Sequence, residues 1–293
     1  MKIAPEIADA LAEHGPVVAL ETTLVAHGFP RGEGLDVGRA CEAAVRAAGA
    51  IPATIGVLDG EIRVGLYDAE LQRFADAGEE ARKAGPRDLA ACAAQGAIGA
   101  TTVGGTLTVC RAAGIVTMGT GGIGGVHRGW AQSFDISADI GALSNTPALV
   151  VAAGAKSILD VPATAELLET FAVPVLGFRT DELPLFYRAE GGPPVSARVE
   201  SAAEAAQVAT AHWKLGGCGL LLARPPDESL DVEPLIEDGL AEAERQGVRG
   251  PAVTPFVLAF LHERSGGETV EANKRLVVAN AGLAGEVAVA LRV

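Results

Sequence analysis

The chain has 293 residues, of which 49% are hydrophobic and only 4% are aromatic. This hydrophobic content is enough for a large buried core and excludes an intrinsically disordered chain. The formal net charge of −14 argues against long polyphosphate ligands, so we expect no nucleic-acid polymer as a partner. A small anionic substrate remains compatible with this charge, because a few cations and backbone amides can hold one phosphate.

The sequence also predicts where the protein works. Its first residues, MKIAPEIADALAEHG, have the pattern of an amphipathic helix and lack a hydrophobic signal core. A helix that spans a bilayer needs about 18 apolar residues, and no apolar run in this sequence is that long. The cysteines are widely spaced and form no CxxC pair, which favours reduced core thiols over a disulfide or zinc site at Cys41, Cys92, Cys110 and Cys218. We therefore expect a cytoplasmic protein that makes no membrane contact.

Short apolar runs alternate with helical patterns along the chain. Strands are predicted over residues 16–21, 51–60, 61–66 (as a hairpin with the preceding run), 99–103, 114–120, 147–154, 173–180 and 219–225. Helices are predicted over residues 34–49, 158–172, 201–217, 231–247 and, at the end of the chain, 254–293. This alternation predicts a three-layer α/β/α fold with a largely parallel sheet covered by helices on both faces. Since no linker divides the chain, we expect one domain over residues 1–293.

Polar residues that follow these strands are the first candidates for function, because ligands bind outside the carboxyl ends of parallel strands. In ALETTLVAHGFP, Glu21 follows four apolar residues at the end of a strand. A buried carboxylate there costs several kcal/mol unless it is paired or protonated. Glu21 is therefore either a structural group that caps a helix or pairs an arginine, or a general acid with a raised pKa.

The second candidate is the glycine-rich stretch GTGGIGGVHRG, residues 119–129. Its glycines let the backbone approach a ligand closely, and its amides can point at an anion. Gly119, Gly121 and Gly124 formally match a dinucleotide-binding fingerprint, but that fingerprint should open a helix and VHRGW follows instead. The pattern favours phosphate or sugar-phosphate binding, with a donor and a fixed charge from His127 and Arg128.

The third candidate is FDISADIGALSNT, in which Asp135 and Asp139 are four residues apart. On one helical turn the two carboxylates would share a face and repel each other unless a cation lies between them. A hard divalent cation such as Mg²⁺ or Mn²⁺ would satisfy them. The alternative is an ordinary helix start, with Asp or Ser as the cap and the next carboxylate in the first turn.

Two lysines complete the set. Lys156 ends the strongly apolar run LVVAAGAK, where desolvation favours a neutral amine of the kind that Schiff-base catalysis needs. The alternative is a lysine whose stem packs on the sheet while its ammonium reaches solvent. Lys83, in EEARKAGPRDLA, is expected in a mobile Gly/Pro loop as a phosphate clamp or as a plain surface charge.

Taken together, these segments resemble the pseudouridine-5′-phosphate glycosidases and the related C-glycoside synthases of secondary metabolism. The likeness covers essentially the whole chain and is carried by the order and spacing of the motifs ALETTLVAHGFP, IPATIGVLDGEIRVGL, TGGIGGVHRG, FDISADI, AGAKSILD, LETFAVPVLGFRT and NAGLAGEVA, together with the Lys83 segment ending in RDL. The resemblance implies a homotrimeric α/β/α enzyme that acts on the C–C bond between C1′ of ribose 5-phosphate and a base.

The resemblance also implies residue roles. Lys156 falls on the covalent nucleophile, which forms a Schiff base, and Glu21 falls on the proton donor. Asp135 falls on the ligand of a divalent metal, most often Mn²⁺. Substrate-binding or pocket positions are matched by Lys83, Val103, Thr120, His127, Ser137, Ala138, Asp139 and Asn280.

The chain departs from the family pattern near the expected base pocket. Glu and Thr are common between the HR and DISAD segments, where this chain has Trp130, Ala131, Gln132 and Ser133. The usual ANP after a late strand reads ARPP, with Arg224, and the usual TVAAT reads TVGGT. These changes leave open a synthase that joins ribose 5-phosphate to a larger, non-uracil aromatic aglycone.

Overall fold

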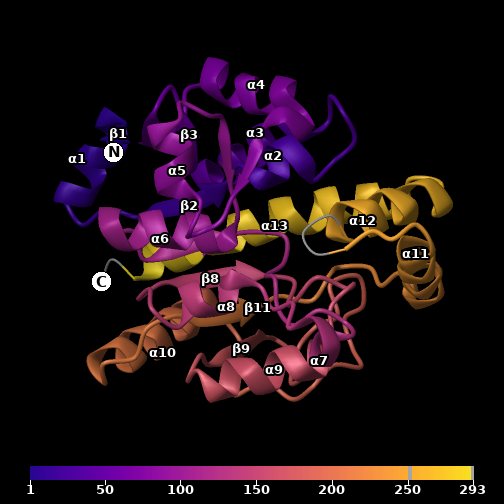
Figure 1. The fold of residues 1–293 in the computed structure, drawn as a ribbon. Helices are drawn as coiled ribbons and strands as arrows, with labels where there is room; N and C mark the ends of the chain where they lie inside the picture. The colour runs from indigo at the N-terminus through magenta and orange to yellow at the C-terminus, as the bar shows by residue number, and fades with distance from the viewer. Residues whose placement is uncertain (250–252, 292–293) are drawn as a thin grey trace.

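One largely parallel β-sheet forms the centre of the computed structural model, which describes residues 1–249 and 253–291 (Figure 1). Its strands are β1 (Lys2–Ile3), β2 (Val17–Glu21), β3 (Ile51–Leu58), β4 (Glu61–Val64), β5 (Arg82–Ala84), β6 (Gly99–Thr101), β7 (Thr117–Gly119), β8 (Leu149–Ala152), β9 (Val175–Phe178), β10 (Ala197–Val199) and β11 (Leu220–Ala223). The main order is β1-β4-β3-β2-β7-β8-β11-β9-β10, and β6 joins β5 to β3. Only the pairs of β3 with β4 and with β6 are antiparallel in the described residues.

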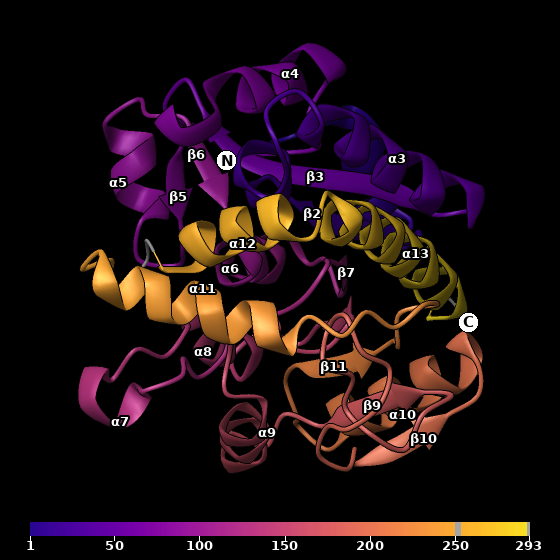
Figure 2. The same cartoon turned by 90° about the vertical axis from the view of Figure 1, so that its right-hand side faces the viewer.

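Helices cover the sheet. They are α1 (Pro5–Ala12), α2 (Thr23–His27), α3 (Gly34–Ala47), α4 (Asp68–Ala77), α5 (Leu89–Ala94), α6 (Val103–Ala113), α7 (Trp130–Ser133), α8 (Ala138–Leu143), α9 (Val161–Thr170), α10 (Ala202–Lys214), α11 (Glu233–Arg245), α12 (Val253–Arg264) and α13 (Glu268–Ala290), with a short 3₁₀ turn η1 (Gly78–Glu80). The long helix α13 packs on β2, β7 and β8 between α3 and α10, whereas α6 packs on β2 and β3 and against α8. Helices α11 and α12 pack against each other beside this layer (Figure 2).

The predicted α/β fold is therefore confirmed, and each predicted strand and helix is present. The short strands β1, β5 and β10 were not predicted, because runs of two or three residues carry little periodicity. The last two residues of the predicted C-terminal helix, 292 and 293, lie outside the described residues. None of the helices in the described part of the chain combines the length and apolar composition of a membrane span.

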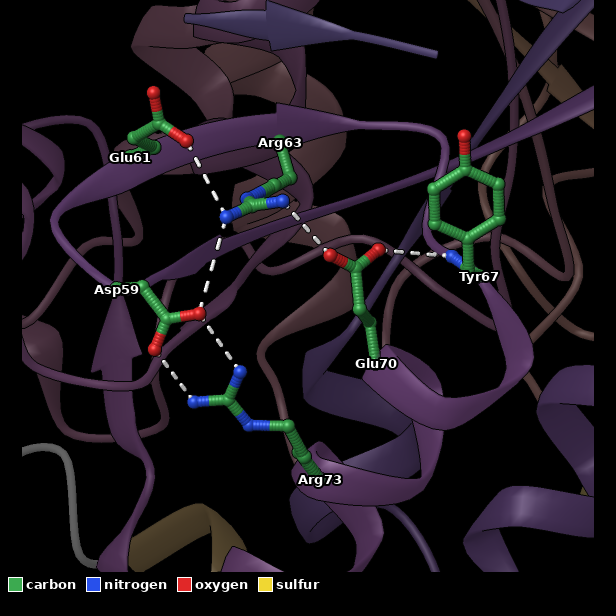
Figure 3. Close-up of polar contacts among 6 residues, drawn as sticks. All are labelled: Asp59, Glu61, Arg63, Tyr67, Glu70 and Arg73. Carbon is green, nitrogen blue, oxygen red and sulfur yellow. Dashed lines mark hydrogen bonds and ion pairs between the residues drawn. The ribbon is translucent and has the colours of Figure 1, made fainter.

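The β3–β4 hairpin shows how local sequence sets the framework. Its turn residues Asp59 and Gly60 both have positive φ, at 54° and 77°, the conformation of the two-residue turns that Asp-Gly favours. Beside the turn, the Arg63 guanidinium contacts Glu61 at 3.2 Å and Glu70 of α4 at 2.8 Å (Figure 3). Arg73 of α4 contacts Asp59 at 2.7 Å. This ion-pair network fastens α4 to the hairpin.

Candidate active site

Three strand ends bring the first candidates together. Strand β7 lies between β2 and β8, and all three are parallel. Glu21 is the last residue of β2, Thr120 follows β7 directly, and Lys156 lies in the loop after β8. All three residues therefore stand at the same edge of the sheet, as the sequence predicted.

The glycine-rich loop and the Lys156 loop are joined by backbone hydrogen bonds beyond the ends of their strands. The Ala153 amide donates to the Gly121 carbonyl at 2.8 Å, and the Ile123 amide donates to the Gly154 carbonyl at 3.0 Å. The Lys156 amide in turn donates to the Ile123 carbonyl at 3.0 Å. Because both loops are held by these bonds, the backbone that carries Lys156 has a defined position.

The other edge of the glycine-rich loop is held by the segment that carries the two aspartates. The Ser137 amide donates to the Gly125 carbonyl at 2.9 Å, and the His127 amide donates to the Asp135 carbonyl at 3.0 Å. The loop thus lies between the Lys156 segment and the Asp135 segment. It does not open a helix, since the four-residue α7 follows only at Trp130, so the dinucleotide fingerprint lacks its structural context.

Glu21 is buried, with 4% of its surface exposed. Burial raises the pKa of its carboxyl above the ordinary value, while the Lys156 ammonium and a hydrogen bond from the Thr120 hydroxyl oppose that rise. The side chain neither caps a helix nor pairs an arginine among the described residues, so the structural alternative is wrong. A buried carboxyl whose pKa is raised, within the field of a lysine charge, has the properties that the predicted general acid needs.

Lys83 does not lie in a mobile loop, and that prediction is wrong. It is the middle residue of β5 and pairs with Ala100 of β6. Much of the side chain is accessible to solvent, yet the neighbouring protein partly desolvates the ammonium and lowers its pKa. The Lys156 charge lowers that pKa further, while Asp139 and Glu21 oppose it. The charges of Lys156, Asp139 and Glu21 therefore all reach the Lys83 ammonium, so the four side chains belong to one site.

Asp139 holds two backbone segments together. Its Oδ1 accepts a hydrogen bond from the Gly104 amide at 2.7 Å, and its Oδ2 accepts one from the Gly124 amide at 2.8 Å. Ser137 caps α8, and its hydroxyl accepts from the Asp139 amide at 3.2 Å. The alternative of an ordinary capped helix is therefore correct for these two residues. Asp135 precedes the helix, so the predicted pair of carboxylates on one helical face is wrong.

Asp135 keeps a carboxylate near the site. Its Oδ2 lies 3.9 Å from Nδ1 of His127, and about a third of its side chain is exposed (33%). Desolvation lowers the pKa of His127, while the Asp135 carboxylate raises it. Among the described residues, no three His, Cys, Asp or Glu side chains gather as a metal-binding cluster. A divalent ion that keeps most of its waters needs only one or two carboxylates, and Asp135 fits that kind of site.

Comparison with known proteins agrees with this geometry. Residues 6–290 match the family described as indigoidine synthase A like protein. The pseudouridine-5′-phosphate glycosidase of Myxococcus xanthus is 47% identical over 99% of this chain and 98% of its own, and that of Caldanaerobacter subterraneus is 47% identical over 99% and 96%. This chain belongs to the pseudouridine-5′-phosphate glycosidase family. The resemblance predicted from the motifs is thereby confirmed.

Solved structures extend the comparison. The prealnumycin C-glycosynthase AlnA, in complex with ribulose 5-phosphate, is 42% identical with a TM-score of 0.89, covering 99% of this chain and 96% of its own. An indigoidine synthase A-like protein from Thermotoga maritima is 38% identical with a TM-score of 0.87, covering 95% and 94%. The family thus includes glycosidases and a C-glycosynthase on one fold.

The other predicted site residues of this family member lie close to the same loops. Asn280 of α13 is buried, and its Nδ2 donates to the Thr120 carbonyl at 2.9 Å and to the Gly121 carbonyl at 3.3 Å. Ala138 is the exposed first residue of α8. Val103 begins α6, but its side chain is 1% exposed and belongs to the core. Because this side chain is buried, only the backbone amides at the start of α6 can bind a ligand at this position.

Arg128 has a different role from the predicted ligand charge. Its guanidinium contacts Glu233 at 2.6 Å and donates to the Ser157 carbonyl at 3.2 Å. It therefore braces the loop that carries Lys156, at the wall of a cavity of about 360 Å³ that Ser157 also lines. Local sequence contains no signal for this, because Glu233 is more than a hundred residues away.

Proposed function

We propose that this protein cleaves or forms the C–C bond between C1′ of ribose 5-phosphate and a carbon of a base or aglycone. The observation that carries this proposal is the meeting of buried Glu21 with Lys156 at one sheet edge, where their charges act on each other. Relatives that are 47% identical over nearly the whole chain are named for this chemistry.

A lysine is needed because a C-glycosidic bond has no heteroatom in its leaving group. The Lys156 amine attacks C1′, the bond from C1′ to the ring oxygen breaks, and Glu21 supplies the proton that the ring oxygen takes up. The attached nitrogen is now a secondary ammonium and returns one proton to the Glu21 carboxylate. The lone pair that this frees forms an iminium at C1′ as the C–C bond breaks, and the base carbon takes up that proton from Glu21. Water hydrolyses the iminium to free Lys156 and ribose 5-phosphate. The same steps in reverse make the C–C bond.

The remaining residues bind and orient the sugar phosphate. Lys83 supplies a cation and the glycine-rich loop supplies backbone amides, the two kinds of group that hold a phosphate. Asp135 with neighbouring His127 would hold a divalent ion, for which we propose Mn²⁺. Such an ion, when bound, polarises the substrate or water oxygens that it contacts.

We further propose a homotrimer that works in the cytoplasm. The trimer rests on the family resemblance of the sequence motifs, and the location rests on the widely spaced cysteines, which form no CxxC pair. Light scattering of the purified protein tests the assembly, since a particle of one chain mass (29.7 kDa) would contradict it. Fractionation of the source cells tests the location.

Borohydride trapping tests the central step. The protein is incubated with ribose 5-phosphate and borohydride, digested, and the peptide mass that carries the sugar is identified. The adduct should lie on Lys156, and Lys156→Arg should abolish both adduct and turnover, because guanidinium does not deprotonate usefully. The matched control is Lys214→Arg, at an exposed end of α10. An adduct on Lys83, or undiminished turnover in Lys156→Arg, would refute the assignment.

A second function has its own support. AlnA, the C-glycosynthase, is 42% identical, and this chain carries Trp130 and Phe134 beside Asp135, with 38% and 79% of their surfaces exposed. Exposed aromatic rings near the site suit a larger aromatic aglycone than uracil. Changing Ala131 to Glu and Gln132 to Thr should then raise turnover of pseudouridine 5′-phosphate. Efficient cleavage by the unmodified enzyme, with the exchange only harmful, would refute this second function.

A further inference from the structure

Two asparagines of α13 flank one glycine of the site. Asn273 and Asn280 are seven residues apart, about two helical turns, so their side chains share a face. Asn280 donates to the Gly121 carbonyl at 3.3 Å, and a Cβ built on Gly121 would lie 3.5 Å from Oδ1 of Asn273. Asn280 was predicted as a site residue from the sequence, whereas Asn273 was not.

The amide oxygen of Asn273 has no hydrogen-bond donor within the described residues, although the residue is only 4% exposed. Its neighbours across Gly121 are apolar, because the same built Cβ lies 3.7 Å from Leu276 and 3.8 Å from the Phe186 ring. A buried acceptor left without a donor costs about 1–3 kcal/mol. A leucine of similar shape would avoid that cost, so the asparagine lowers folding stability unless its oxygen finds a donor.

The position of Asn273 along α13 puts it on the active edge of the sheet. Near the other end of this helix, Val289 lies 3.7 Å from a Cβ built on Gly49, just before the start of β3, so the C-terminal part of α13 lies at the opposite edge. Asn273 lies in the N-terminal part, beside the loop that follows β7. It is therefore on the side of the sheet where Glu21 and Lys156 meet.

We propose that Asn273 binds substrate, its Oδ1 accepting a hydrogen bond from a hydroxyl group of the sugar phosphate. An amide oxygen only accepts, so it selects a donor. The phosphate dianion and a carboxylate are acceptors and cannot satisfy it, whereas the sugar chain carries several hydroxyl donors. This inference rests on the proposed function, because it assigns a contact to the sugar phosphate of that reaction.

The test compares Asn273→Leu with Thr117→Val. Thr117, at the start of β7, is 1% exposed and its hydroxyl also has no partner in the described part of the chain, so it is a matched orphan outside the site. Both variants should keep or raise the melting temperature. Asn273→Leu should weaken calorimetric binding of ribose 5-phosphate about tenfold and leave binding of inorganic phosphate unchanged, the loss expected for one hydrogen bond. Thr117→Val should change neither.

Gly121→Ala is the second variant, because its methyl group meets only ordinary contacts yet lies against the Asn273 oxygen. It should weaken the binding of ribose 5-phosphate in the same way. The inference is overturned if Asn273→Leu weakens the binding of ribose 5-phosphate and of inorganic phosphate equally. It is also overturned if Asn273→Leu weakens neither. If the unmodified protein itself neither binds ribose 5-phosphate nor forms a lysine adduct, the proposed function fails instead, so the two failures are distinguishable.

Discussion

The Thr120 hydroxyl donates a hydrogen bond to Oε1 of Glu21, joining the ends of β7 and β2. A threonine hydroxyl rotates and can either donate or accept, so this partner suits both the ionised and the protonated carboxyl. The Thr120 carbonyl meanwhile accepts from Asn280 at 2.9 Å, which fixes the backbone that carries the hydroxyl. The protonation state of Glu21 can therefore change without a rearrangement of its neighbours.

Glu21→Gln should make the protein more stable at alkaline pH, relative to the unmodified chain. Burial raises the pKa of Glu21 in the folded state. The stability that the Glu21 carboxyl contributes is therefore fully present below the pKa that this carboxyl has in the unfolded chain. That contribution is lost as pH rises through the raised folded pKa. The melting-temperature difference in favour of Glu21→Gln should therefore grow from pH 4 to pH 8. Turnover should fall about 10²–10⁴-fold, the share of a general acid.

A melting-temperature difference that is the same at pH 4 and pH 8 would contradict the burial account of Glu21. Unchanged turnover in the Gln variant would contradict its role as the acid.

Asp139→Asn should destabilise the fold by about 2–4 kcal/mol, because a carboxamide has one oxygen for two backbone donors and turns its NH₂ toward the other. The donors are the amides of Gly104 and Gly124. Urea unfolding measures the loss. Asp135→Asn is the matched control and should stay within about 0.5 kcal/mol of the unmodified chain, since its side chain is partly exposed. Equal losses in the two variants would remove the special role of Asp139.

Gly124→Ala should reduce sugar-phosphate binding and stability together. A Cβ there would lie 2.3 Å from the Ser137 hydroxyl and 2.8 Å from Oδ2 of Asp139, so the glycine-rich loop must shift. Gly141→Ala, inside α8 with nothing within 4 Å of the built Cβ, is the control and should stabilise by about 0.5–1 kcal/mol. Thermal melts and calorimetry measure both. A Gly124→Ala protein that binds ribose 5-phosphate normally would show that the loop has room.

Asp135→Ala should lose binding of Mn²⁺ while the fold is kept. Within the described part of the chain the Asp135 carboxylate accepts no hydrogen bond, and its side chain is 33% exposed, so its removal leaves the packing intact. Calorimetric titration of Mn²⁺ into the free protein measures the affinity without turnover, and activity should fall in parallel. Mn²⁺ affinity equal to that of the unmodified chain, or full activity in exhaustive chelator, would count against Asp135 as the metal ligand.

Arg63→Ala should cost about 2–3 kcal/mol of unfolding free energy, because it leaves the half-buried Glu70 without its cation. The side chains of Arg63 and Glu70 are 14% and 16% exposed. Arg73→Ala removes the outer ion pair of the same network, where the arginine is 43% exposed, and should cost less than about 1 kcal/mol (Figure 3). Chemical unfolding measures the free energy of unfolding of both variants. A larger loss in Arg73→Ala than in Arg63→Ala would contradict this prediction.

Several parts of the site were predictable because local pattern reports burial and chain direction. Four apolar residues before Glu21 and seven apolar or glycine residues before Lys156 marked two strands with polar ends. Parallel strands place those ends at one edge, so the presence of Glu21 and Lys156 at the same edge followed from pattern alone. Their closeness depends on the strand order β2-β7-β8, which the pattern does not give. Lys83 was misjudged because its strand has only three residues and lies between acidic and Gly-Pro segments.

The sequence by itself determined the alternation of strands and helices, the burial of Glu21 and the family. Only the tertiary structure decided which partner each polar group has. Asp139 accepts from an amide 35 residues earlier in the chain, and Arg128 donates to a glutamate 105 residues later. Asn273 of α13 lies beside Gly121, in the loop after β7. The physical reason is that periodicity reflects solvent exposure along the chain, whereas a hydrogen bond depends on atoms that folding brings together from distant segments.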